Sequence, residues 1–379
     1  MDQKNLLQFL KKSLSYILVA AVASAITWFL ADKTPNSKLE QLANVIDRKF
    51  IGQADQTAIQ DAAADAMVEA LGDRWSYYVP ADQQDYYEKR RNNAYVGIGV
   101  SVMKRADGRG YDIMAVTSGG PAEEAGILAG DIITHADGTA VGDLEVTQVQ
   151  ELIMGEKNTR VVLKLLRGEQ ILELSVTRRT IQTRVAEGRM LSDNIGLVTI
   201  QNFFDHSGEE SIGAVEDLLA QGAEKLIFDV RNNPGGYVDE MVQILDHLLP
   251  EGPLFRSVSY SGKESVEESD GSCVEVPMAV IFNGNTYSAA EFFAAALSEY
   301  DWAVTVGEPT CGKGYYQTSH TFSDGSSVSL STGRYMTPNG VSLAEAGGLV
   351  PDIPAEHAQG GVTPEQDPQI RAAMEELMG

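Results

Sequence analysis

Apolar runs that alternate with helix-like segments in the second half of the chain restrict the fold more than any other feature. Helices are predicted near residues 208–221, 238–249 and 288–299. Four apolar segments with the length of strands flank these helices: IGLVTI, KLIFDV, PMAVIF and AVTVG, which begin at Ile195, Lys225, Pro277 and Ala303. Strands that alternate with helices form a largely parallel sheet with helices on its faces. We therefore predict an α/β domain in this part of the chain.

The composition excludes several classes of function. The 379 residues carry 29 basic and 54 acidic side chains, a formal net charge of −25, and a phosphate backbone needs a basic surface, so no nucleic acid partner is expected. The two cysteines, Cys273 and Cys311, are too few for a disulfide scaffold or a thiolate zinc site, although a bond between them stays open. The five histidines lie far apart without an HExxH spacing. We expect no metal and no organic cofactor.

An uncharged apolar segment of 17 residues, 14–30, lies close to the N-terminus. Its length is at the lower limit for a membrane-spanning helix. Three lysines precede it and place the N-terminus in the cytoplasm, with the rest of the chain outside. The alternative is a signal peptide cleaved at Ala23-Ser24-Ala25, which would leave an apolar stub on the mature chain. We therefore predict a single-pass signal anchor within residues 1–33, and a bacterial cell envelope as the location.

The remaining residues divide into four regions by their sequence pattern. Residues 34–93 are predicted to be helical, with an aromatic-rich turn at residues 75–80. Residues 94–179 change to short strands and turns that close with a hairpin, a block large enough to fold alone. Residues 180–354 contain the predicted α/β domain. Residues 355–379 form a polar tail with a short C-terminal helix.

The block at 94–179 begins with a strand interrupted by glycines, formed by Tyr95, Val96, Gly97, Ile98 and Gly99. The two glycines let successive backbone N–H groups turn toward a peptide carboxylate, and a strand edge can accept an extended peptide. A plain β-bulge is the simpler interpretation of a lone GxG. However, the order of elements and the stretch SGGPAEEAGILAGDIITHADGTAV at 118–141 resemble a PDZ domain, which has two helices on a partly open barrel. The resemblance implies that residues 95–100 hold the free C-terminus of a peptide.

Ser288 lies between an apolar strand and an Ala-rich helix. With Glu291 it forms a capping-box pattern, which predicts a helix start. A serine at a strand-to-helix turn also exposes its hydroxyl, as a nucleophile requires. The pattern is compatible with both roles and does not decide between them.

A serine nucleophile needs a base. Lys313 lies between two glycines, and burial would have to lower its pKa from about 10.4 for it to act as one. Gln317 follows four residues later, within reach of a hydrogen bond to Lys313. His320 and His206 are alternative bases, but no recognisable motif places an Asp to orient either of them.

Asn-Pro-Gly-Gly at 233–236 follows another predicted strand. Gly235 and Gly236 allow backbone N–H groups to converge on one point, which is the requirement for an oxyanion hole. Ala289, the residue after the candidate nucleophile, commonly supplies the second amide at such a turn. A simple turn between strand and helix is the alternative.

These segments together resemble the carboxyl-terminal processing proteases, also called tail-specific proteases. The matching motifs are LGDRWSYYVP, the PDZ-like block, DVRNNPGG, the Ser-x-x-Glu helix start, the Gly-Lys-Gly loop and GRYMTPNG…GGLVPD. They cover essentially all of the chain beyond the apolar segment. The resemblance implies a PDZ domain inserted before a ClpP/crotonase-like α/β protease core. The chain departs from the family pattern at Asn285-Thr286-Tyr287, and at Cys311, where an aromatic residue is usual.

The resemblance also implies residue roles: Ser288 as nucleophile, Lys313 as general base, Gln317 orienting Lys313, and Gly236 and Ala289 as oxyanion amides, with Gly235 as a further candidate. We expect a membrane-anchored serine endopeptidase that binds the free C-termini of protein substrates. Helices beside the PDZ-like block are compatible with a homo-oligomer. Three alternatives stay open: a catalytically silent PDZ scaffold, a Ser–His hydrolase, and a crotonase-like enzyme that binds acyl-CoA.

Overall fold

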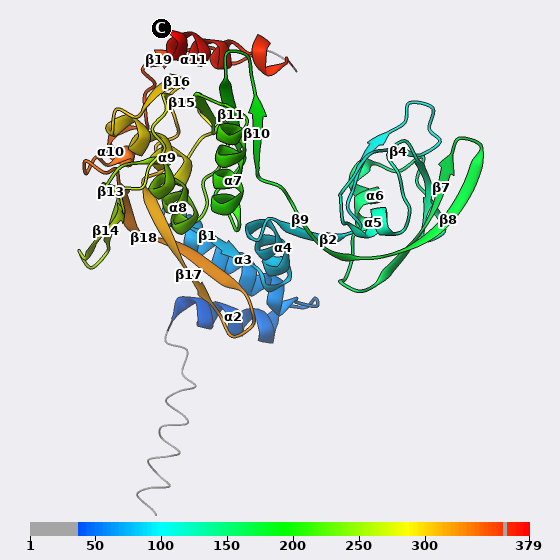
Figure 1. Cartoon of the computed structure of the whole chain (residues 1–379). Helices are drawn as coiled ribbons and strands as arrows, with labels where there is room; N and C mark the ends of the chain where they lie inside the picture. The colour runs from blue at the N-terminus through cyan, green and yellow to red at the C-terminus, as the bar shows by residue number, and fades with distance from the viewer. Residues whose placement is uncertain (1–36, 359–361) are drawn as a thin grey trace, which may run out of the picture. The chain divides into compact units, whose positions relative to one another are not determined.

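The computed structural model describes residues 37–358 and 362–379 (Figure 1). The predicted signal anchor and its alternative cleavage site therefore lie outside the described residues. Within the described ranges, the helices are too short or too polar to cross a membrane. The chain divides into two compact units, residues 1–67 and 68–379.

The described part of the first unit is helical, as the sequence predicts. Helix α2 (Lys38–Lys49) begins at the N-cap Ser37, whose hydroxyl accepts from the Glu40 N–H, while the Glu40 carboxylate accepts from the Ser37 N–H. Helix α3 (Gln56–Glu69) follows, and its last residues belong to the second unit.

A six-stranded sheet forms the centre of the α/β core. Its four central strands begin and end close to the predicted positions, whereas the two edge strands were not predicted. The order is β10 (Ala186–Met190), β11 (Ile195–Ile200), β12 (Lys225–Asp229), β15 (Met278–Phe282), β16 (Ala303–Gly307) and β19 (Ile353–Pro354). All neighbouring pairs from β11 onward are parallel, and β10 is an antiparallel edge. The predicted α/β architecture with a largely parallel sheet is confirmed.

Helices cover both faces of this sheet (Figure 1). On one face, Val198, Phe228 and Val280 pack in a single core with α7 (Ser207–Ala220), α8 (Val238–Leu248) and α9 (Ala289–Glu299). On the other face, alternate strand residues pack against α11 (Pro368–Met378). Side chains alternate between the two faces of a strand, so strands buried on both faces are apolar throughout.

A second, five-stranded sheet in the protease core has no counterpart among the predicted elements. It contains β1 (Tyr77–Val79), β13 (Gly252–Ser259), β14 (Glu264–Ser269), β17 (Tyr315–Thr321) and β18 (Ser327–Met336). The predicted aromatic turn at 75–80 is in part strand β1, which pairs with β18. Two short helical elements, η1 (Ala81–Gln83) and α4 (Gln84–Arg91), follow it. Strands β17 and β18 are rich in Ser and Thr, and only Val328 and Leu330 of β18 alternate with polar residues, so neither segment stands out as an apolar run.

The PDZ-like block has its own sheet and its own apolar core. The sheet contains β3 (Val100–Lys104), β4 (Tyr111–Val116), β5 (Ile132–Ala136), β6 (Thr139–Ala140), β7 (Arg160–Arg167) and β8 (Gln170–Thr177). Helices α5 (Pro121–Glu124) and α6 (Val146–Ile153) accompany it, and their buried residues belong to the same core. The predicted closing hairpin is β7–β8.

The strand predicted from residue 95 is divided in two by Gly99, whose φ of 79° is unfavourable for other residues. Its first part is β2 (Ala94–Gly97), which pairs with β9 (Arg179–Gln182) as a separate two-stranded sheet. These two strands are the linkers through which the chain enters and leaves the PDZ-like block.

Candidate active site

Ser288 is the N-cap of α9 and is only 7% exposed. Its φ of 60° and ψ of −132° lie where a non-glycine residue is strained, and strained turns of this kind present a nucleophile at the end of a strand. The Ser288 N–H donates to Glu291 Oε2 at 2.9 Å, as the capping-box pattern predicts for the glutamate. The N-terminus of α9 favours negative charge beside the serine.

Gly236 lies in an isolated parallel bridge with Phe203. The Phe203 N–H donates to the Gly235 carbonyl at 2.9 Å, and the Tyr237 N–H donates to the Phe203 carbonyl at 2.7 Å. In a parallel bridge, a residue whose two neighbours in the chain bond to the partner strand directs its own N–H away from that strand. The Gly236 N–H is therefore directed away from Phe203, and Gly236 lines the same cleft as Ser288.

Only glycine fits at this point of the chain. A Cβ at Gly236 would lie 2.2 Å from the carbonyl carbon of Phe203, and a Cβ at Gly235 would lie 2.8 Å from the backbone nitrogen of Ala289. The glycine turn and the start of α9 are thus in direct contact. The Gly235 N–H donates to Asn233 Oδ1 at 2.8 Å, so this amide already has a partner.

Lys313 is partly buried, and its desolvation lowers its pKa from the ordinary value of 10.5. Electrostatic interactions with Cys311, Asp73 and Glu291 oppose this shift in pKa, and the interaction with Arg74 adds to it. The Nζ atom lies 4.7 Å from the centroid of the Trp75 ring and 5.9 Å from that of Tyr287. A lysine whose neutral form is favoured in this way is suited to accept a proton.

Glu291 connects the serine turn to the lysine loop. The side chain is fully buried, and its Oε1 accepts from Thr310 Oγ1 at 2.5 Å and from the Gly312 N–H at 2.7 Å. Its Oε2 accepts from the Lys313 N–H at 2.8 Å and from the Ser288 N–H. The sequence identifies Glu291 only as a helix-capping residue, because its other hydrogen-bond donors lie in the lysine loop, which is remote in the sequence.

Gln317 lines the cleft but makes different contacts from those expected. Its Nε2 donates to the Tyr315 carbonyl at 3.0 Å and to Ser331 Oγ at 3.1 Å. In the described part of the chain no hydrogen bond joins Gln317 to Lys313. A register shift in the β17–β18 pair falls between Tyr316 and Gln317, and such bulges change the direction of side chains beside active sites.

Ser288, Lys313, Gln317 and Gly236 line one cleft of about 410 Å³. Its walls are rich in aromatic side chains: Tyr77, Tyr87, Phe204, Tyr237, Tyr287, Tyr315, Tyr316 and Tyr335. The alternative bases His320 and His206 do not line it. The arrangement provides a buried serine, a lysine of lowered pKa and a glycine amide at one place.

A second pocket, of about 370 Å³, lies in the PDZ-like block. Of the predicted carboxylate-binding residues, Tyr95, Gly97, Ile98 and Gly99 line it, and Val96 does not. Residues of β3 and the side chains of Gln150, Ile153 and Met154 complete it. A groove between a strand and a helix with an apolar floor is suited to an extended peptide with an apolar end.

Cys273 and Cys311 are both free thiols, and Arg74 Nη2 donates to the Cys311 sulfur at 2.6 Å. Across residues 37–358 and 362–379, no three His, Cys, Asp or Glu side chains are grouped to hold a metal ion.

Comparison with known proteins gives the same two modules. Residues 194–355 match peptidase family S41, and residues 113–167 match the PDZ domain. The chain is 31% identical over 356 residues to the carboxy-terminal processing protease CtpA of Bacillus subtilis, covering 90% of this chain and 76% of that protein. It is 29% identical over 363 residues to a probable CtpA-like serine protease of Staphylococcus aureus, covering 91% and 72%.

A solved structure of a putative S41 protease from Bacteroides fragilis has the same fold, with a TM-score of 0.55 at 16% identity. It covers 91% of this chain and 98% of that one. The combination of an S41 α/β core and a PDZ domain identifies this chain as a serine peptidase. The chain belongs to the carboxy-terminal processing proteases of peptidase family S41.

Proposed function

We propose that this protease is an endopeptidase that uses Ser288 as nucleophile and Lys313 as general base. The observation that supports this assignment best is the shared cleft. Ser288, Lys313 and Gly236 all line it, although they come from three separate loops. These loops follow β12, β15 and β16. The carboxyl ends of parallel strands are where α/β proteins bind their ligands.

The proposed reaction uses side chains and backbone amides of this chain. Neutral Lys313 takes the proton of the Ser288 hydroxyl while Oγ attacks the peptide carbonyl carbon. The Gly236 and Ala289 N–H groups stabilise the negative charge on the carbonyl oxygen, which is worth about 3–4 kcal/mol for one such donor. Lys313 then gives the proton to the leaving amine. Water releases the acyl group from Ser288 by the same steps in reverse.

We also propose that the PDZ groove binds the free C-terminus of the substrate. Gly97 and Gly99 interrupt the strand at the mouth of the groove, and Met154 contributes a flexible apolar wall. The apolar segment at residues 14–30 is proposed to anchor the chain in the membrane of a bacterial cell, with the protease outside the cytoplasm.

The test uses the full-length protein in detergent, with Ser288→Ala and Lys313→Ala variants of matched folding. Each is incubated with an unfolded protein that ends in a free apolar C-terminus, and with the same protein amidated at its C-terminus. Mass spectrometry measures cleavage. We expect cleavage by the unsubstituted protein only, and slower cleavage of the amidated substrate. Near-normal activity of Lys313→Ala would exclude the Ser–Lys mechanism.

A matched pair of methionines tests the PDZ groove. Met154 lines the groove and is 37% exposed, whereas Met114 lies elsewhere on the same domain and is 52% exposed. Met154→Glu is expected to weaken binding of a peptide with an apolar free C-terminus about tenfold, and Met114→Glu is expected to leave it unchanged. Equal effects of the two variants would place the peptide site elsewhere. Tight peptide binding without cleavage by any form would indicate a scaffold.

A further inference from the structure

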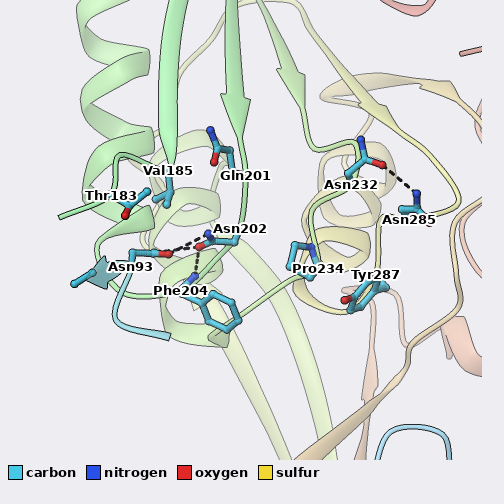
Figure 2. Close-up of a pocket in the computed structure, with 11 residues that line it drawn as sticks. Asn93, Thr183, Val185, Gln201, Asn202, Phe204, Asn232, Pro234, Asn285 and Tyr287 are labelled. Atoms are coloured by element: carbon cyan, nitrogen blue, oxygen red, sulfur yellow. Dashed lines mark hydrogen bonds between the residues drawn. The ribbon is translucent and has the colours of Figure 1, made fainter. Parts of the chain in front are cut away.

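A larger groove of about 670 Å³ adjoins the catalytic cleft (Figure 2). It lies where β11, β12 and β15 end, because its lining contains the residues that follow each of these strands. Its lining residues are Asn93, Ala94, Thr183, Val185, Gln201, Asn202, Phe204, Asn232, Pro234, Asn285 and Tyr287. We call it the amide groove, after its four asparagines and one glutamine.

The amide groove is continuous with the cleft that holds Ser288. Phe204, Pro234 and Tyr287 line both. At its other side the groove is bounded by Asn93 and Ala94 at the start of β2 and by Thr183 directly after β9. The groove thus extends from the catalytic cleft to the two linkers that lead into the PDZ domain.

The walls of the amide groove are held in place by their own hydrogen bonds. Figure 2 shows the labelled side chains in two groups that face each other. In one group Asn93 and Asn202 exchange two amide hydrogen bonds, at 3.1 and 3.0 Å, and Asn202 Oδ1 also accepts from the Phe204 N–H at 2.9 Å. In the other group Asn285 Nδ2 donates to Asn232 Oδ1 at 3.1 Å. The groove is therefore preorganised.

Other polar groups of the lining are available to a ligand. The side chains of Gln201 and Thr183 are exposed and make no hydrogen bond to any described residue. Apart from the phenol of Tyr287, the lining contains no titratable side chain, in a chain whose formal net charge is −25. Amides and hydroxyls both donate and accept, which matches the alternating N–H and C=O groups of an extended polypeptide better than it matches an ion.

We propose that the amide groove binds the substrate segment that follows the scissile bond, as an extended, uncharged polypeptide whose main chain bonds to Gln201 and Thr183. This inference rests on the proposed function, because the direction of the chain is taken from capture of the C-terminus by the PDZ domain. A substrate that is bound at Ser288 and has its C-terminus in the PDZ domain must run past the two linkers. The part that runs past them is the segment on the C-terminal side of the scissile bond. The groove therefore selects uncharged residues after the cleaved bond.

The test separates binding from cleavage by using full-length Ser288→Ala protein. Cleavage by the unsubstituted enzyme first locates the scissile bond in a reference peptide. Amidated peptides, which avoid the PDZ carboxylate site, are then extended by about six uncharged residues on either the C-terminal or the N-terminal side of that bond. We expect the C-terminal extension to lower Kd. In Gln201→Ala or Thr183→Ala, the factor by which the extension lowers Kd should be at least fivefold smaller. The exposed Gln221, at the end of α7, provides the control Gln221→Ala, which should retain it.

Three results would overturn the inference: a C-terminal extension without effect on Kd, equal losses in Gln201→Ala and Gln221→Ala, or a loss confined to the N-terminal extension. A charge exchange gives a second readout. Gln201→Lys is expected to shift preference at least fivefold toward peptides with Asp or Glu after the scissile bond, and an unchanged preference would contradict the proposal. Failure of the unsubstituted enzyme to cleave would refute the proposed function and, with it, this inference. Normal cleavage together with equal Kd values for Gln201→Ala and Gln221→Ala would refute the inference alone.

Discussion

The Nζ atom of Lys313 lies 4.7 Å from the centroid of the Trp75 ring. The indole thus lies beside the amine that is proposed to become positively charged during the reaction. Trp75 is itself held in position, because its backbone N–H donates to Asp73 Oδ1 at 3.1 Å and the Arg74 guanidinium lies 4.1 Å from its ring centroid. The electron-rich face of the Trp75 ring stabilises the protonated form of Lys313, and the bulk of the ring keeps water away from the amine.

The first prediction concerns this ring. Trp75→Leu keeps apolar bulk but removes the attraction between ring and cation, about 0.5–2 kcal/mol. We expect kcat to fall roughly two- to thirtyfold and the acid limb of the profile of kcat/KM against pH to move to lower pH, because the lysine cation loses a stabilising partner. The kcat of Trp75→Phe should lie between that of Trp75→Leu and that of the unsubstituted enzyme. A limb that moves to higher pH in Trp75→Leu would mean that entry of water outweighs the lost attraction.

The lowered pKa of Lys313 also predicts a pH-dependent cost in stability. Between the pKa of the folded state and 10.5 in the unfolded state, the unfolded chain binds more protons, so stability rises with pH in that window. Below the window the full penalty is present, about 1.4 kcal/mol for each unit by which folding lowers the pKa. Lys313→Met should therefore raise Tm near neutral pH, and its advantage should shrink as pH approaches 10.5. The exposed Lys263→Met is the control, and an equal rise in Tm there would contradict this explanation.

Glu291→Gln is predicted to damage both stability and activity. The glutamine amide nitrogen would face N–H or O–H donors now bonded to a carboxyl oxygen, and each buried group left without a partner costs about 1–3 kcal/mol. We expect a Tm several degrees lower and a kcat at least tenfold lower, since the serine turn and the lysine loop lose their common anchor. The comparison is Glu209→Gln, on the exposed side of α7. Normal kcat in Glu291→Gln would show that the two loops are held together by other contacts.

Gly236→Ala tests the proposed role of the Gly236 N–H in stabilising the oxyanion. The added Cβ would lie 2.2 Å from the Phe203 carbonyl carbon, so the backbone must move and its N–H with it. We expect kcat to fall about 10²- to 10³-fold, the usual effect of losing one oxyanion donor, with binding of substrate to the PDZ groove unchanged. Gly213→Ala, in α7 where no atom lies within 4 Å of the new Cβ, is the matched control. A Gly236→Ala enzyme that keeps its kcat would remove this amide from the mechanism.

The sequence by itself determined the parallel sheet and the turn that presents Ser288. Strands such as β12 and β15 are buried on both faces and are therefore continuous apolar runs. The start of α9 is marked by the Ser288–Glu291 spacing, and the turn after β12 is marked by the adjacent glycines at 235 and 236. Each of these signals lies within a few neighbouring residues, so it can be read without knowledge of the fold.

Tertiary structure alone decided which distant segments complete the site. Strand β1 pairs with β18, which brings Trp75 to Lys313, and Gln317 turns to Ser331 across the β17–β18 bulge. Arg231 follows β12 but binds Asp367 at the start of α11 at 2.8 Å. Such contacts join residues far apart in the chain and depend on packing and desolvation, which have no period along the sequence. The chemical groups were therefore predictable from the sequence, whereas the environment that lowers the pKa of Lys313 was set by the fold.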